Sequence, residues 1–140
     1  MRDILDFYVA GHALIHNKGK YLITRRSSLN DYQPLKWDIP GGEMAPGETL
    51  EEVIHREVME ETQLQIDILR VIHVYTNRDQ LPKRQTIQVI YLCENIRGEI
   101  RLNPSEHDIF KWIKYQEIAN HDLISFLADL TKKYTPLNNA

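Results

Sequence analysis

Apolar and β-branched residues alternate with polar ones along several stretches of the chain, a pattern typical of strands with one buried face. Residues 7–16 form the first stretch, and a polar turn at 17–20 separates it from a second, which predicts a hairpin. A polar loop is expected over residues 77–84, between the two longest later stretches. The predicted strands cover residues 7–16, 21–24, 37–39, 65–76, 85–94, 98–102 and 110–114.

From Leu50 onward, the hydrophobic period changes to that of a helix. Thr49 and Glu52 have the spacing of a capping box, so the helix is expected to begin at Leu50 and to end near Thr62. A second amphipathic helix is predicted over residues 118–134. Its apolar face carries Leu123, Phe126, Leu127 and Leu130. Strands, an inserted helix and a terminal helix together predict an α/β fold in which helices flank a mixed β-sheet.

Composition narrows the class of protein. The 140 residues are 42% hydrophobic with a formal net charge of −3, which fits a globular protein and argues against nucleic-acid binding through bulk positive charge. Cys93 is the only cysteine, so an internal disulfide is excluded. No stretch resembles a membrane span, and residues 1–6 carry acids where a signal peptide needs apolar residues. We therefore expect a cytoplasmic protein with no nucleic-acid or membrane partner, and a homodimer is left open.

Three glutamates interrupt the apolar stripe of the first predicted helix. The stripe begins at Leu50, and the positions seven and eleven residues later are Glu57 and Glu61, with Glu60 beside them and Thr62 on the opposite face. Such carboxylates repel one another, lose solvation and lie at the helix end that disfavours anions. A divalent cation would compensate all three effects, and hard oxygen ligands favour magnesium or manganese over zinc.

The alternative is a solvated acidic face, with His55 and Arg56 as partners of the glutamates. Runs of charge usually cover a surface without binding anything. The phase of the acids, which continues the apolar stripe, favours the metal site instead. His107 and His121 have no partner at metal-ligand spacing, so both are expected to be ordinary side chains.

The segment around this helix resembles the Nudix box, whose pattern is G-x5-E-x7-R-E-U-x-E-E-x-G-U with U an aliphatic residue. The matching positions are Gly42, Glu48, Arg56, Glu57, Val58, Glu60, Glu61 and Leu64. Gln63 stands where the family has its last glycine. Because such a glycine usually serves a left-handed C-cap, Gln63 is expected either to carry a modest backbone cost or to adopt another turn, in both cases without loss of a metal ligand. The resemblance implies a Nudix-type α/β/α sandwich, with residues 1–140 as one Nudix hydrolase domain.

The resemblance also implies roles for particular residues. Glu57, Glu60 and Glu61 would hold Mg²⁺, with Mn²⁺ as a substitute, and the backbone carbonyl of Gly42 would be a further ligand. Glu57 or Glu106 would act as the general base, and the sequence does not choose between them.

Around these ligands, the same resemblance implies binding and supporting residues. Arg26 would bind a substrate phosphate, as the fork geometry of a guanidinium allows. Asn120 would contact the base. Glu48 and Arg56 would form a structural pair that supports the box.

The residues before the box, Ile23-Thr24-Arg25-Arg26, resemble those of MutT-type nucleoside triphosphate pyrophosphohydrolases, which release a nucleoside monophosphate and pyrophosphate. A small nucleotide is therefore the expected substrate. One alternative is an ADP-ribose or ADP-sugar pyrophosphatase, suggested by Pro82 in the loop where such enzymes often carry a proline. Another is a non-catalytic nucleotide sensor, which the retained metal ligands disfavour.

Overall fold

The computed structural model describes residues 6–78 and 84–136. Its strands form one seven-stranded sheet within these residues, with the order β3-β2-β1-β6-β5, while β4 pairs with β1 and β7 pairs with β2. β1 and β6 are parallel and the other pairs are antiparallel, so the sheet is mixed. The elements are β1 (Asp6–Asn17), β2 (Lys20–Arg26), β3 (Trp37–Asp38), β4 (Gly41–Glu43), α1 (Leu50–Thr62), β5 (Gln65–Asn77), β6 (Arg84–Arg97), β7 (His107–Ile113), α2 (Tyr115–Ile118) and α3 (Ser125–Lys133).

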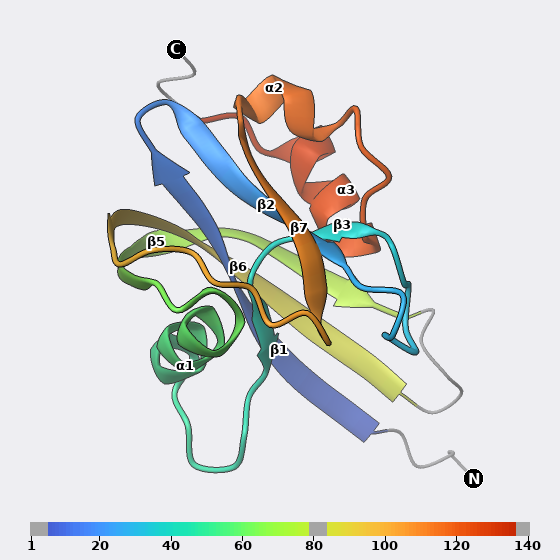
Figure 1. Cartoon of the computed structure of the whole chain (residues 1–140). Coiled ribbons are helices and arrows are strands. Elements are labelled where there is room, and N and C mark those ends of the chain that lie inside the picture. The colour runs from blue at the N-terminus through green and yellow to red at the C-terminus, as the bar shows by residue number, and fades with distance from the viewer. Residues whose placement is uncertain (1–5, 79–83, 137–140) are drawn as a thin grey trace, which may run out of the picture.

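Helices cover both faces of this sheet, with α1 on one side and α2 and α3 on the other (Figure 1). Neighbouring residues of a strand point to opposite faces, and the two cores follow that alternation. Ala13 and Ile15 of β1 pack in the core under α1, whereas Leu14 packs in the core under α3. The predicted α/β/α arrangement, a mixed sheet flanked by helices, is confirmed.

The predicted bounds of α1 are confirmed, together with its capping box. The hydroxyl oxygen of Thr49 accepts from the backbone N–H of Glu52 at 3.2 Å, and the carboxylate of Glu52 accepts from the backbone N–H of Thr49 at 3.0 Å. The helix ends on Gln63, which has φ 63° and is left-handed. The glycine-like conformation expected at this position is therefore adopted by a glutamine.

The single helix predicted over residues 118–134 was wrong. The chain forms α2 and α3 instead, and the segment between them runs beside β3. The backbone N–H of Trp37 donates to the carbonyl of Asp122 at 2.8 Å, and that of Ile124 donates to the carbonyl of Trp37 at 2.9 Å. These bonds to another strand replace intrahelical bonds, which is why an apolar period alone did not locate the break.

Three other segments differ from prediction. Residues 98–102 contain no strand, because the backbone there bonds to the end of α1, where the N–H of Arg101 donates to the carbonyl of Thr62 at 2.9 Å. Conversely, β4 forms at Gly41–Glu43, where no strand was predicted. The predicted loop 77–84 is shorter at both ends, and residues 79–83, including Pro82, lie outside the described residues. Among the described helices, none is long and apolar enough to span a membrane.

Candidate active site

The candidate site lies where β4 passes close to α1. A Cβ atom on Gly42 would lie 2.6 Å from the carboxyl carbon of Glu57, so glycine at this position leaves room for the Glu57 carboxylate where it lies. The neighbouring Gly41 donates its backbone N–H to the Oε2 atom of Glu61 at 2.7 Å. The Pro-Gly-Gly segment thus places strand backbone directly against two helical carboxylates.

Glu57 and Glu61 lie about one turn apart on α1, and both belong to the buried or half-buried side of the helix. Glu61 is only 4% exposed. Burial, followed by the negative charge of Asp38, raises the pKa of Glu61 well above its ordinary value. Burial also raises the pKa of Glu57, although the Nη1 atom of Arg56 donates to its Oε1 atom at 2.8 Å and opposes this shift. A bound cation would relieve both carboxylates.

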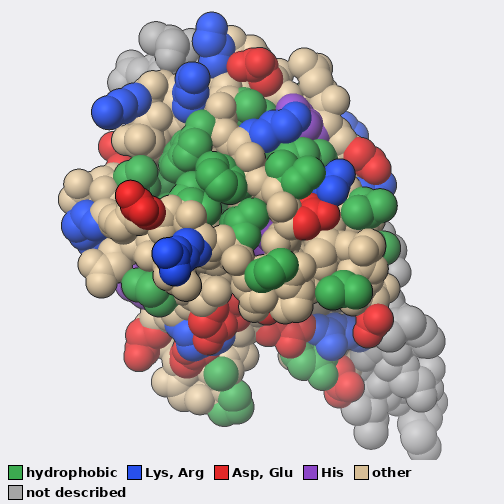
Figure 2. Space-filling model, in the orientation of Figure 1, with side chains coloured by type: hydrophobic (Ala, Val, Ile, Leu, Met, Phe, Trp, Pro, Cys, Tyr) green, Lys and Arg blue, Asp and Glu red, His purple; other side chains and the backbone are tan. Residues whose placement is uncertain are grey.

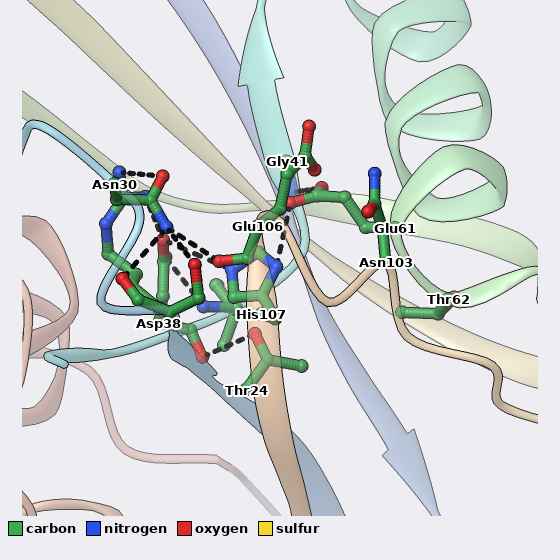
Figure 3. A network of polar contacts seen from close by, with 12 residues as sticks. Thr24, Asn30, Asp38, Gly41, Glu61, Thr62, Asn103, Glu106 and His107 are labelled. Atoms are coloured by element: carbon green, nitrogen blue, oxygen red, sulfur yellow. Dashed lines mark hydrogen bonds and ion pairs between the residues drawn. The ribbon is translucent and has the colours of Figure 1, made fainter. Parts of the chain in front are cut away.

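Glu106 and His107 reach the same place from the opposite side, from the start of β7 and the residue before it. One ligand atom each from Glu61, Glu106 and His107 lie within 4.8 Å of one another. The Nδ2 atom of Asn30 donates to the backbone carbonyl of Glu106 at 2.7 Å and holds this turn in place. Figure 3 shows Glu106 and His107 directed toward Glu61.

Asp38 lies behind this group and is 4% exposed. Its Oδ2 atom accepts from Nη1 of Arg26 at 3.0 Å and lies 3.9 Å from Nε2 of His107. Burial by itself would raise the pKa of Asp38, but His107, His12 and Arg26 together hold it below its ordinary value. Asp38 is therefore a buried anion that fixes the orientation of Arg26.

Arg26 makes three contacts inside the protein. Besides Asp38, it donates from Nε to the backbone carbonyl of Tyr32 at 3.0 Å and from Nη2 to the amide oxygen of Asn30 at 3.2 Å. A guanidinium has five N–H donors, so further donors remain for a ligand. Arg26 lines both hollows of the site.

The first hollow, here termed the acidic cleft, has a volume of about 230 Å³. It is lined by Arg26, Asn30, Gly41, Gly42, Glu57, Glu61, Glu106 and His107. Acidic and arginine side chains gather on the surface over and beside α1, at the lower edge of the view in Figure 2.

The second hollow, here termed the aromatic hollow, has a volume of about 120 Å³. Its walls include His12, Tyr32, Gln88, Ile124 and Phe126, and it shares Arg26, Gly41 and Gly42 with the acidic cleft. The two hollows therefore adjoin at these three residues. Burial lowers the pKa of His12 against the opposing charge of Asp38, so this imidazole is neutral at pH 7.

On the outer side of α1, Arg56 links the helix to the loop before it. Its Nε and Nη2 atoms donate to the two carboxylate oxygens of Glu48 at 2.7 and 2.8 Å, a bidentate pair. This pairing lowers the pKa of Glu48 to about 2. Arg56 also donates to the backbone carbonyl of Glu43 at 3.1 Å, so one guanidinium connects β4, the loop and the helix.

Comparison with known proteins agrees with this arrangement. The NUDIX domain family matches residues 7–134, which is most of the chain. The chain belongs to the NUDIX family.

Relatives and solved structures extend this result. The chain is 34% identical to the nucleoside triphosphatase NudI of Salmonella agona and 31% identical to NudI of Escherichia coli K12. Each alignment spans 120 residues and covers 79% of this chain and 84% of the relative. It is similar in fold to the MutT protein of Methanosarcina mazei (TM-score 0.82, 26% identity, 92% of this chain and 93% of that one). The MutT NUDIX hydrolase of Burkholderia pseudomallei is also similar (TM-score 0.80, 21% identity, 93% and 99%).

The predicted site residues of this NUDIX domain fall into two groups. Five of them line the acidic cleft: Arg26, Gly42, Glu57, Glu61 and Glu106. Glu60 is exposed on α1, where it forms an ion pair with Arg56 at 3.4 Å, and it is not among the residues lining the cleft. Asn120 is exposed in the turn after α2 and lines neither hollow.

Sequence reasoning missed four buried polar residues. His107 was expected to be ordinary, yet it is 2% exposed and lies between Asp38 and Glu61, with neither ring nitrogen hydrogen-bonded within the described residues. Asp38 carried one signal, since it is a charged residue between the apolar Trp37 and Ile39. No feature of the sequence indicated the pairing of His12 with Gln88.

The placement of Thr62 on the exposed side of α1 was wrong. Thr62 is fully buried, donates from its hydroxyl to the carbonyl of Val58 at 2.7 Å and accepts from the N–H of Leu64 at 3.2 Å. The last turn of α1 is covered by the sheet and also by the segment near residue 101, so its buried arc is wider than the first turns suggest.

The residues of the acidic cleft fit a hard divalent cation. Carboxylate and backbone carbonyl oxygens are the ligands that magnesium and manganese prefer. The backbone of Gly42 lies against the Glu57 carboxylate, and burial raises the pKa of both Glu57 and Glu61 although Arg56 pairs with Glu57. A bound cation would stabilise both anions.

Proposed function

We propose that this NUDIX protein hydrolyses nucleoside triphosphates to a nucleoside monophosphate and pyrophosphate, with Mg²⁺ held in the acidic cleft and Mn²⁺ as a substitute. The observation that carries the proposal is the convergence of Glu57, Glu61 and Glu106 on one cleft beside Arg26. The relatives named nucleoside triphosphatase support the choice of a triphosphate.

Glu57 and Glu61, with the backbone carbonyl of Gly42, would hold the cation, and Glu60 would join them from the rim. When bound, the cation neutralises phosphate charge and makes phosphorus easier to attack. Arg26 would bind a phosphate through the donors that it does not use on Asp38, Tyr32 and Asn30. Asp38 keeps that guanidinium oriented without competing for every donor.

Glu106 is the better candidate for the general base. Burial raises the pKa of Glu57, but its Oε1 atom already accepts a hydrogen bond from Arg56 at 2.8 Å, which leaves that oxygen less available to an attacking water. No hydrogen bond or ion pair engages the Glu106 carboxylate within the described residues, and the side chain faces the cleft. Glu106 would therefore accept a proton from the attacking water.

A turnover assay tests the proposal. Purified protein is incubated with a panel of nucleoside triphosphates, ADP-ribose and dinucleoside polyphosphates, with and without Mg²⁺, and pyrophosphate, phosphate and monophosphate are quantified. Metal-dependent release of pyrophosphate supports the proposal. Cleavage of ADP-ribose alone would indicate an ADP-sugar pyrophosphatase, and binding without turnover would indicate a sensor.

Three variants on α1 locate the reaction. Glu61→Gln and Glu60→Gln should each lower turnover at least about a hundredfold, since metal-bound charge stabilisation supplies several kcal/mol. Glu51→Gln is the matched control, because Glu51 is exposed on the first turn of the same helix. Wild-type turnover in both Glu60→Gln and Glu61→Gln, with Mg²⁺ limiting, would exclude the α1 site.

The remaining expectations concern the cellular form of the protein. We expect residues 1–140 to act as one domain in the cytoplasm, with a small nucleotide as the ligand and neither nucleic acid nor membrane as a partner. A homodimer is open to test by light scattering coupled to size-exclusion chromatography.

A further inference from the structure

The aromatic hollow is lined partly by side chains that the chemistry of the acidic cleft does not use. It adjoins the acidic cleft at Arg26, Gly41 and Gly42, which line both hollows. Its walls are formed by apolar and aromatic side chains from the segment at the start of α3, namely Ile124 and Phe126, and by the ring of Tyr32 from the loop after β2. A ligand whose phosphates lie in the acidic cleft would extend its other end into this hollow.

A buried polar pair lies among these apolar walls. His12 of β1 and Gln88 of β6 are 6% and 7% exposed, and the Nε2 atom of His12 lies 2.7 Å from the Oε1 atom of Gln88. Phe126 stacks on the imidazole with ring centroids 4.0 Å apart and an interplanar angle of 30°. Gly41 packs against the other imidazole nitrogen, since a Cβ atom there would be 2.4 Å from Nδ1. The ring is therefore held from three sides.

The contact with His12 orients the Gln88 amide. Its oxygen faces Nε2 of His12, and in the tautomer that carries its proton on Nε2 the imidazole donates and the oxygen accepts. The two N–H donors of the Gln88 amide have no partner within the described residues, and Gln88 lines the hollow. Gln88 thus adds a hydrogen-bond donor to a hollow whose other polar lining residues are His12, Tyr32, Arg26, Asp38, Glu43 and Thr86. A few placed polar groups of this kind set the orientation and specificity of a ligand.

We propose that the Gln88 amide donates a hydrogen bond to a carbonyl oxygen of the nucleobase, so that the site favours bases with an oxo group over those with an amino group at that position. His12 is a positioning residue, since it acts on the ligand through Gln88. The aromatic walls would bracket the flat ring of the base. The inference rests on the proposed function, because a nucleotide must place its phosphates in the acidic cleft for its base to reach Gln88.

Matched nucleotides test this inference. UMP and CMP differ by an oxo-for-amino exchange with the adjoining ring proton, and so do IMP and AMP. Binding of the four monophosphates is measured by calorimetry without metal, and kcat/KM is measured for the corresponding triphosphates with Mg²⁺. The wild-type protein should favour UMP over CMP and IMP over AMP by about tenfold, the scale of one hydrogen bond between neutral groups.

Two variants of Gln88 and one control variant complete the test. Gln88→Glu replaces the donor by an acceptor and should reverse both preferences. Gln88→Met keeps the size without the donor and should bring both ratios close to one; it carries the test if the carboxylate variant does not fold. Gln65→Glu is the matched control, because Gln65 is exposed at the start of β5, and it should keep the wild-type ratios.

The outcomes separate the two proposals. Three results would overturn the role of Gln88, even with pyrophosphate released normally. These are equal affinities within each pair of nucleotides, a preference for the amino bases, or an oxo-to-amino affinity ratio that Gln88→Met leaves unchanged. Base selectivity in binding without pyrophosphate release would support Gln88 and overturn the proposed hydrolysis. Failure of all four monophosphates to bind, together with failure of every triphosphate to be hydrolysed, would overturn both.

Discussion

Gln63→Gly introduces the residue that the family carries at the end of its signature, and the structure predicts that it stabilises the protein. Gln63 closes α1 with φ 63° and ψ 16°, in the left-handed region. Its backbone N–H donates to the carbonyl of Met59 at 2.9 Å, a bond that glycine retains. The side chain is exposed, so little buried contact is lost.

The magnitude follows from two opposing backbone effects. Left-handed backbone costs a residue with a Cβ atom about 1–2 kcal/mol, which glycine avoids. Glycine loses about 0.5–1 kcal/mol more conformational entropy on folding. The net stabilisation is about 0.5–1 kcal/mol, which corresponds to a rise in Tm of about 1–4 °C for a domain of this size.

Calorimetry on Gln63→Gly and on Gln65→Gly measures this effect against a matched control. Gln65 lies two residues later in the extended backbone of β5, where glycine gains nothing and should destabilise the protein by about 0.5–1 kcal/mol. Turnover of Gln63→Gly should stay within a few-fold of wild type, since Gln63 is not among the residues lining either hollow. A Tm lowered to the same extent in both variants would refute the strain argument. Activity that arises only in Gln63→Gly would instead mark the natural chain as a sensor.

Three further predictions concern the acidic cleft. Because the pKa of Glu61 is raised in the folded protein, the metal-free protein should lose stability as pH rises from about 4.5, the ordinary value, through the folded pKa. Glu61→Gln should reduce this loss, which is measured as Tm against pH in the presence of EDTA. A pH profile that is the same in Glu61→Gln and wild type would contradict the burial argument. Arg26→Ala should lower kcat/KM by about ten- to a hundredfold, while Mg²⁺ affinity stays nearly unchanged. It should also lower the free energy of unfolding by about 3 kcal/mol, since Asp38 loses its buried cationic partner. Unaltered kcat/KM on every substrate would leave Arg26 with a structural role only. Gly42→Ala should place a methyl group against Glu57 and reduce turnover at least about tenfold. The far-ultraviolet circular dichroism spectrum should be preserved. Wild-type turnover would show that α1 can move to accommodate the methyl group.

Features determined by neighbouring residues were predicted from the sequence. α1, its capping box and its left-handed end depend on contacts within a few residues, such as Thr49 with Glu52, and all three were found where the pattern indicated. The same holds for the convergence of Glu57 and Glu61, because helical geometry fixes their common face. The family signature lies in this local segment, which is why it could be recognised from the sequence alone.

Features determined by distant neighbours were not predicted. The break between α2 and α3 arises from bonds between Trp37 and the segment 122–124, and the burial of Thr62 arises from packing against residues beyond the helix. Hydrophobic periodicity reports how residues of one element share a face, but it does not say how many other elements cover that face.

The candidate site divides along the same line. Two helical carboxylates were readable from spacing, whereas the grouping of Glu61 with Glu106 and His107 requires β7 to pair with β2. The contact between His12 and Gln88 joins residues 76 positions apart and exists only because β1 and β6 are paired in parallel in one register. A strand pattern specifies which side chains face the same way, and the tertiary structure alone decides which of them meet, because pairing and register depend on the packing of the whole sheet.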